Sequence, residues 1–303
     1  MRELDSHSAG LIVFIYFYLF NKETITLERV KTGVPGFDGL IQEGIPRGFN
    51  VLLVGQPGAG KTIFGLQYLV NGAMAGENGI YVSLDSSNEM VKSQGRVFGW
   101  DVDGLEKSGK INFMKIRLDK PKIYLFDMLR DAIKKSNAKR LVFDSLADFE
   151  INIDQFIVPI DYNLKKEAEE EDARNRTQFE GAGSSPAGDQ MHARVFYKGH
   201  SERRTSYFAI NEFGNLGTTN MLITEEQMGE EQSSIDGISE YICDGVLRFS
   251  IERIAKEATR SLTIKKMRNT DHTLDSMVFK ITQKGIHLSG DVAFQGSKVS
   301  GIT

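Results

Sequence analysis

Hydrophobic positions along the chain form short apolar runs that alternate with longer amphipathic stretches. Residues 50–54 are apolar and β-branched, which is typical of a buried strand, and apolar side chains recur at helical spacing after Thr62. Strands are also predicted at 79–84, 111–116, 140–145 and 218–224, and helices at 89–98, 122–135 and 207–213. Strands that alternate with helices predict an α/β fold with a mainly parallel central sheet.

The last part of the chain has a different pattern. Apolar runs at 245–251, 261–265, 278–282 and 285–288 follow one another without a helix between them. Between the first two runs we expect a turn that contains Lys256 and Arg260. Strands in this hairpin order pair antiparallel. The pattern therefore predicts a mainly parallel sheet that is flanked by helices and carries antiparallel strands at its C-terminal edge.

Two segments depart from this pattern. Residues 11–20 are uncharged and apolar but too few to cross a bilayer as a helix, which takes about 20 residues. This favours a strand or an apolar tail packed on this or another subunit over a membrane-surface anchor. Residues 161–200 hold an acidic charge run and a turn-rich stretch, which indicates a long, exposed, partly disordered insertion. The acidic run itself favours a solvated helix face over a docking site for a basic protein partner. We predict an extension over 1–23, one domain over 24–290 and a tail over 291–303.

Composition narrows the functional classes. The net charge of −4 gives no overall basic footprint, so DNA binding is possible but not favoured. The single cysteine, Cys243, excludes an intramolecular disulfide and fits the reducing cytoplasm.

The strongest chemical signature follows the first strand. Residues 55–62 read GQPGAGKT and fit the phosphate-loop pattern G-x-x-x-x-G-K-[ST], with a strand before it and a helix after it. Glycines allow backbone N–H groups to surround a phosphate, Lys61 can reach the β- and γ-phosphates, and the Thr62 hydroxyl can ligate Mg²⁺. The alternative is a glycine-rich turn with a chance lysine. The predicted ATP-binding residues are Gly55, Gln56, Pro57, Gly58, Ala59, Gly60, Lys61, Thr62 and Ile63.

Two aspartates end strands on the same predicted sheet edge. Asp144 follows three apolar residues, the Walker B form, and is the predicted Mg²⁺ partner of Thr62. Asp85 ends the strand at 79–84. It can orient or deprotonate an attacking water, or it can cap the following helix, and the residues alone leave both roles open.

The order of these motifs resembles the KaiC-like branch of the RecA superfamily, including single-domain RadA paralogues. The resemblance runs from about Thr32 to Leu288, without the insertion. Besides the phosphate loop it rests on TGVPGFD (32–38), QYLVNG (67–72), FGWD (98–101), LVFDS (141–145), TEE (224–226) and KMR (266–268). The resemblance implies a RecA-like P-loop ATPase core that uses ATP and Mg²⁺ and forms a homo-oligomeric ring, usually a hexamer, with nucleotide between subunits.

The resemblance also implies roles for Lys266 and Arg268, which would act on the γ-phosphate of a neighbouring subunit. The residues alone also allow a solvent-exposed basic strand end. One departure concerns the second strand, where the family usually has two adjacent glutamates and this chain has Asp85-Ser86. Aspartate is one methylene shorter, and a displacement of about 1 Å can cost about 100-fold in rate.

We therefore expect an ATP-binding, slowly hydrolysing ATPase that works as an assembly or signalling switch. The alternatives are a DNA-repair accessory and a scaffold that binds ATP without hydrolysis.

Overall fold

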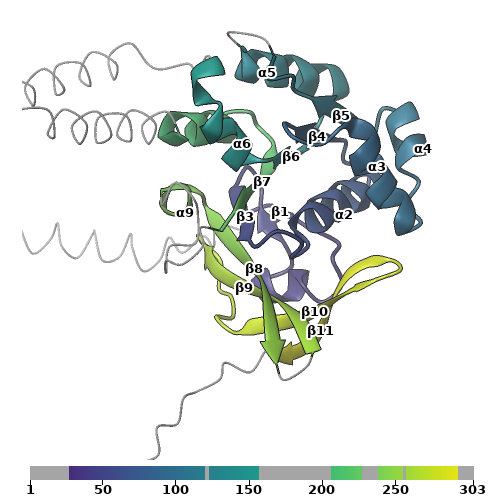
Figure 1. Cartoon of the computed structure of the whole chain (residues 1–303), viewed down its shortest axis with the longest axis vertical. Helices are drawn as coiled ribbons and strands as arrows, with labels where there is room; N and C mark the ends of the chain where they lie inside the picture. Colours follow the sequence, from purple (N-terminus) through teal and green to yellow (C-terminus); the bar gives the residue numbers. More distant parts are fainter. Residues whose placement is uncertain (1–26, 120–122, 157–205, 227–237, 255–256, 293–303) are drawn as a thin grey trace, which may run out of the picture.

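The computed structural model describes residues 27–119, 123–156, 206–226, 238–254 and 257–292 (Figure 1). The predicted extension at 1–23, the predicted insertion at 161–200, Lys256 and most of the predicted tail lie outside the described residues.

A twisted sheet forms the centre of the described chain (Figure 1). Its order is β11-β10-β9-β8-β3-β7-β6-β4-β5, and the strands from β8 to β5 in that order run parallel. Strands β9, β10 and β11 continue it in antiparallel pairs, which confirms the predicted fold class. The strands are β3 (Asn50–Gly55), β4 (Gly79–Ser83), β5 (Ile111–Lys115), β6 (Arg140–Asp144), β7 (Thr219–Glu225), β8 (Gly245–Ile254), β9 (Glu257–Met267), β10 (Ser276–Thr282) and β11 (Gly285–Val292).

Helices cover both faces of this sheet because side chains alternate along each strand. Along β3, Val51 and Leu53 enter one core, with α2, whereas Leu52 and Val54 enter the other. The helices are α2 (Lys61–Met74), α3 (Asn88–Val97), α4 (Val102–Lys107), α5 (Leu125–Ser136), α6 (Leu146–Ile151), α9 (Ser239–Ile242), the 3-10 turns η1 (Asp38–Ile41) and η2 (Ile153–Gln155), and residues 206–214. A short pair, β1 (Arg29–Val30) and β2 (Ile45–Pro46), precedes β3. No helix among the described residues is long and apolar enough to cross a membrane.

Two local predictions need correction. The helix predicted over 122–135 begins at Leu125, and Ile123 instead forms a parallel bridge with Phe156. Arg260, expected in a turn, lies within β9 opposite Ile251 of β8. The polar residues between the two predicted strands belong to the longer β8–β9 hairpin, which extends past the end of β3.

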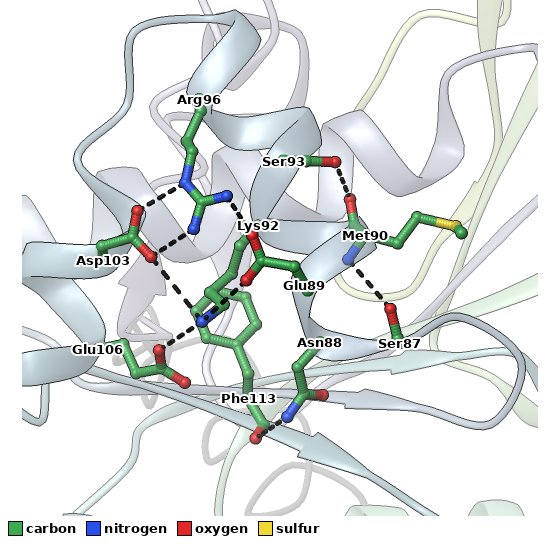
Figure 2. A network of polar contacts seen from close by, with 10 residues as sticks. All are labelled: Ser87, Asn88, Glu89, Met90, Lys92, Ser93, Arg96, Asp103, Glu106 and Phe113. Atoms are coloured by element: carbon green, nitrogen blue, oxygen red, sulfur yellow. Dashed lines mark hydrogen bonds and ion pairs between the residues drawn. The ribbon is translucent and has the colours of Figure 1, made fainter.

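A group of ion pairs fixes α3 against α4 and β5 (Figure 2). Arg96 donates to both carboxylate oxygens of Asp103 at 2.6 and 2.7 Å, and Lys92 contacts Glu106 at 2.9 Å. The Asn88 side-chain amide donates to the Phe113 carbonyl of β5 at 2.9 Å. The start of α3, which follows the exit of β4, is therefore held on the neighbouring strand.

Candidate functional site

The predicted phosphate loop connects the end of β3 to the start of α2. Gly55, Gly58 and Gly60 all have positive φ (154°, 77° and 111°). A Cβ on Gly55 would lie 2.0 Å from the Phe249 carbonyl oxygen, so this exit from the strand requires glycine. The loop residues 56–58 are exposed, and the N-terminus of the 14-residue helix α2 follows them. Free backbone N–H groups and the helix dipole favour an anion here.

Lys61 lies buried beneath this loop. Its Nζ donates to the carbonyl oxygens of Gly55 at 2.6 Å and Gln56 at 3.0 Å. Burial lowers the pKa of Lys61, and the nearby carboxylates of Glu225 and Asp144 partly oppose that shift. Phosphate oxygens entering the loop would meet an ammonium group that is already held in place.

Asp144 joins the helix start to the neighbouring strands. Its Oδ2 accepts hydrogen bonds from Thr62 Oγ1 at 3.0 Å and from the Tyr81 hydroxyl at 2.6 Å. Burial raises the pKa of Asp144, and the hydrogen bonds from Tyr81 and Thr62 lower it in part. Burial and the Asp144 charge also raise the pKa of Tyr81 well above its usual value.

The Thr62 and Asp144 oxygens are hard ligands of the kind that Mg²⁺ prefers. Among the described residues, no group of three or more acidic, histidine or cysteine side chains is arranged to hold a metal.

Asp85 lies just beyond β4, on the same edge of the sheet as Asp144. Strands β4 and β6 pair Ser83 with Asp144, so the exits of the two strands lie side by side. Asp85 is exposed, and within the described chain its carboxylate has no hydrogen-bond partner. It does not cap α3, because Ser87 Oγ accepts the Met90 N–H there at 3.2 Å. Helix capping is therefore the role of Ser87 and not of Asp85. The other role considered for Asp85, orienting or deprotonating a water, stays a prediction.

Lys266 and Arg268 lie together against the C-terminal end of α9. Lys266 Nζ donates to the carbonyls of Glu240, Tyr241 and Cys243 at 3.0, 2.9 and 2.6 Å. Arg268 donates to the Tyr241 carbonyl at 3.1 Å and pairs with Asp244 at 2.9 Å. Neither residue is a free basic strand end: Lys266 is half-buried, and Arg268 is exposed but paired.

Both cations are distant from the phosphate loop of their own chain. The Arg268 N–H donates to the Asp244 carbonyl, and the Asp244 N–H donates to the Asn50 carbonyl, at 2.8 Å each. Lys266 and Arg268 thus lie level with the start of β3, whereas the phosphate loop follows the end of β3. A six-residue strand spans roughly 16 to 20 Å, so neither side chain reaches that loop.

Several residues at the site were not predicted from the sequence. Glu225 pairs in register with Gly55, and the Glu226 N–H donates to the Gly55 carbonyl at 3.3 Å. Arg248 forms an ion pair with Glu226. Arg260 Nε lies 3.4 Å from the Gly58 carbonyl oxygen. The TEE motif was the only sequence signal for any of these contacts, because they join strands that are far apart in the chain.

Comparisons with known proteins agree on one family. The family model described as "ATPase: KaiC" matches residues 30–158 and 198–292. A UPF0273 protein of Thermotoga maritima is 30% identical over 276 residues, covering 86% of this chain and 95% of that protein. A UPF0273 protein of Aeropyrum pernix is 32% identical over 275 residues, covering 90% and 99%.

Two further matches carry descriptive names. The circadian clock protein KaiC3 of Synechocystis is 27% identical over 276 residues, which cover 88% of this chain and 46% of that protein. The crystal structure of a KaiC-like protein from Pyrococcus horikoshii superposes with a TM-score of 0.64 at 28% identity, covering 86% of this chain and 99% of that chain.

Proposed function

Because this chain belongs to the KaiC family of ATPases, we propose that it binds ATP at residues 55–63 and hydrolyses it slowly with Mg²⁺, as a switch for assembly or signalling. The observation that carries this proposal is the contact between Thr62 and Asp144. It joins the end of the phosphate loop to a half-buried carboxylate 82 residues further along the chain. A chance glycine-rich turn does not require such a partner.

The loop residues have distinct roles in this proposal. The backbone N–H groups of the loop bind the phosphates, and Lys61, held at the loop carbonyls, contacts the β- and γ-phosphate oxygens. Thr62 and Asp144 hold Mg²⁺, which when bound offsets the negative charge of the phosphates. The Asp85 carboxylate orients the attacking water and accepts its proton. The water oxygen bonds to the γ-phosphorus, the bond to the β–γ bridging oxygen breaks, and ADP and phosphate leave.

Slow hydrolysis follows from the geometry of Asp85. Its carboxylate is exposed and one methylene shorter than that of the glutamate usual in the family. An unheld carboxylate reaches the productive position for only part of the time, which lowers the rate without weakening ATP binding.

We further propose a ring, with a hexamer as the expected size, in which ATP lies between subunits. Arg268 is then the residue that reaches the neighbouring subunit's γ-phosphate, because it is exposed and lies far from its own loop. Lys266 already uses three hydrogen bonds on α9, so its first role is to support Arg268 and α9. A buried single cysteine is compatible with the cytoplasm, where we place the protein.

One alternative has a specific observation in its favour. The replacement of the usual glutamate by Asp85 also fits a scaffold that binds ATP only to hold its ring together. The net charge of −4 does not favour the DNA-repair alternative, and we do not extend the proposal to it.

Turnover measurements separate the enzyme from the scaffold. With Mg²⁺, we expect the wild type to hydrolyse ATP slowly and Lys61→Ala to lose both binding and turnover. Asp85→Asn should keep ATP binding and lose about 10- to 100-fold in turnover. Asp131→Asn, an exposed aspartate on α5, is the matched control and should behave like the wild type. A wild type that binds ATP but turns over no faster than Lys61→Ala would establish the scaffold instead.

A further inference from the structure

The segment between β4 and α3, residues 84–87, is held through the backbone carbonyls of all four residues and the N–H of Leu84. The Leu84 N–H donates to the Asp144 carbonyl at 2.8 Å, which ties the exit of β4 to the exit of β6. Ser83 Oγ donates to the Ser86 carbonyl at 2.8 Å, and Ser87 caps α3. The only acidic side chain in this segment is Asp85, and its carboxylate is not part of these contacts.

Lys115 makes the two shortest hydrogen bonds to this segment. It is the last residue of β5, in register with Ser83 of β4. Its half-buried side chain donates from Nζ to the carbonyl oxygens of Leu84 and Asp85, both at 2.6 Å. The Lys115 ammonium thus binds the carbonyls of two consecutive peptides, one before and one after the Asp85 Cα, and it forms no ion pair with the Asp85 carboxylate.

The far end of the same segment is also held on β5. Figure 2 shows Asn88, the first residue of α3, with its amide directed to the Phe113 carbonyl, which lies two residues before Lys115. Lys92 and Arg96 also form ion pairs with Glu106 and Asp103, which join α3 to α4 (Figure 2). Residues 84–87 are therefore a short bridge with both ends attached to one strand.

We propose that Lys115 is a positioning residue for ATP hydrolysis. It fixes the backbone of Asp85 so that the carboxylate extends outward from the edge of the sheet where the parallel strands end. This inference rests on the role proposed for Asp85. A shorter carboxylate depends more on where its Cα lies, because it has fewer rotatable bonds with which to reach the water. An ion pair with the carboxylate would reduce its basicity, whereas bonds to the backbone carbonyls position it without that effect.

The test compares three lysine variants of the full chain. Lys115→Met removes the donors and keeps the aliphatic stem, and Lys115→Arg restores donors. Lys110→Met is the matched control, because Lys110 is exposed just before the opposite end of β5. We expect Lys115→Met to lower kcat about 10-fold, with KM for ATP changed less than about twofold, and Lys115→Arg to recover part of the loss. Lys110→Met should match the wild type.

A double-mutant cycle with Asp85→Asn distinguishes positioning from a general structural role. If Lys115 acts through Asp85, Lys115→Met causes no further loss of kcat in the Asp85→Asn background. The same loss in both backgrounds, or a rise in KM with unchanged kcat, would overturn the inference. If Lys115→Met does not fold, Lys115→Arg and Lys115→Gln are compared in the same cycle.

The two proposals fail in different ways. Asp85→Asn with wild-type turnover would overturn the role of Asp85 and, with it, that of Lys115. An inactive Asp85→Asn beside a fully active Lys115→Met would overturn the role of Lys115 alone.

Discussion

Burial moves the two central charged residues of the site toward their neutral forms. The pKa of Lys61 is lowered and that of Asp144 is raised, in both cases mainly by loss of solvent. Phosphate oxygens beside Lys61 favour its charged form, and a divalent cation beside Asp144 favours the carboxylate. Binding of ATP with Mg²⁺ would therefore stabilise both the protonated form of Lys61 and the ionised form of Asp144.

Tyr81 offers a direct test of this electrostatic arrangement. Tyr81→Phe removes the hydrogen bond to Asp144 Oδ2, and the free energy of unfolding should fall by about 1–3 kcal/mol because the half-buried carboxylate loses a donor. The pKa of Asp144 should rise further. A protonated Asp144 cannot hold Mg²⁺, so Mg²⁺-dependent ATP binding should be lost at a higher pH than in the wild type as the pH falls.

The measurement is a titration of Mg²⁺-dependent nucleotide affinity against pH, together with chemical denaturation. Tyr124→Phe, at a tyrosine that is about half exposed, is the matched control and should leave both curves unchanged. An acidic limb that does not move in Tyr81→Phe would contradict the coupling between Tyr81 and Asp144.

Among secondary-structure elements, the strands of the central sheet follow from the sequence but their order does not. Each predicted apolar run from 50–54 to 285–288 corresponds to a strand, because alternation and β-branching are local properties. The neighbours of β3 are β7 and β8, which lie far along the chain. Strand order depends on which faces pack together in three dimensions, and a run of apolar residues does not encode that choice.

The same distinction divides the candidate site. The phosphate loop is contiguous, so the spacing of Gly55, Lys61 and Thr62 was sufficient to predict it. Asp144 was predicted because it ends its own apolar run. Lys115 and Arg260 contact backbone carbonyls in loops that follow other strands, and no local pattern indicates such contacts.

The side chain of Gln67 on helix α2 forms two hydrogen bonds with the backbone of strand β11. The Gln67 amide donates to the Ile286 carbonyl at 3.1 Å and accepts the Ile286 N–H at 2.7 Å, in a fully buried setting. Gln67→Leu leaves both backbone groups of Ile286 unpaired and should lower the free energy of unfolding by about 2–4 kcal/mol.

Denaturant unfolding measures this loss. The control Gln94→Leu makes the same chemical change on α3, where the side chain is only half-buried, and should change stability by less than about 1 kcal/mol. Equal losses for the two variants would show that the contact with Ile286 adds no specific stability.

At the scale of the proposed ring, the position of Arg268 allows a test of whether each ATP site is formed by two neighbouring subunits. Arg268→Ala and Lys61→Ala should each abolish turnover alone. If each site combines the loop of one subunit with Arg268 of the next, rings that contain both variants in equal amounts should regain about one quarter of wild-type activity, since a quarter of the interfaces join two intact halves.

Co-expression of the two variants provides the mixed rings, and turnover per subunit is the measurement. Lys265→Ala, at an exposed lysine near the end of β9, serves as the control and should remain fully active. Mixed rings as inactive as their parents would show that Arg268 does not act on a neighbouring subunit.

The order of the sheet also determines when the protein can bind its nucleotide during synthesis. The side chains of Asn50 and Asn220, 170 residues apart, are hydrogen-bonded at the centre of the sheet. A nascent chain that has just left the ribosome with β3 and α2 has a phosphate loop but neither of the strands that flank β3. Both flanking strands lie in the last third of the sequence, so ATP cannot assist the folding of the first two thirds. The ligand can stabilise the domain only after translation is nearly complete, and until then both edges of β3 expose backbone N–H and C=O groups that can pair with other chains.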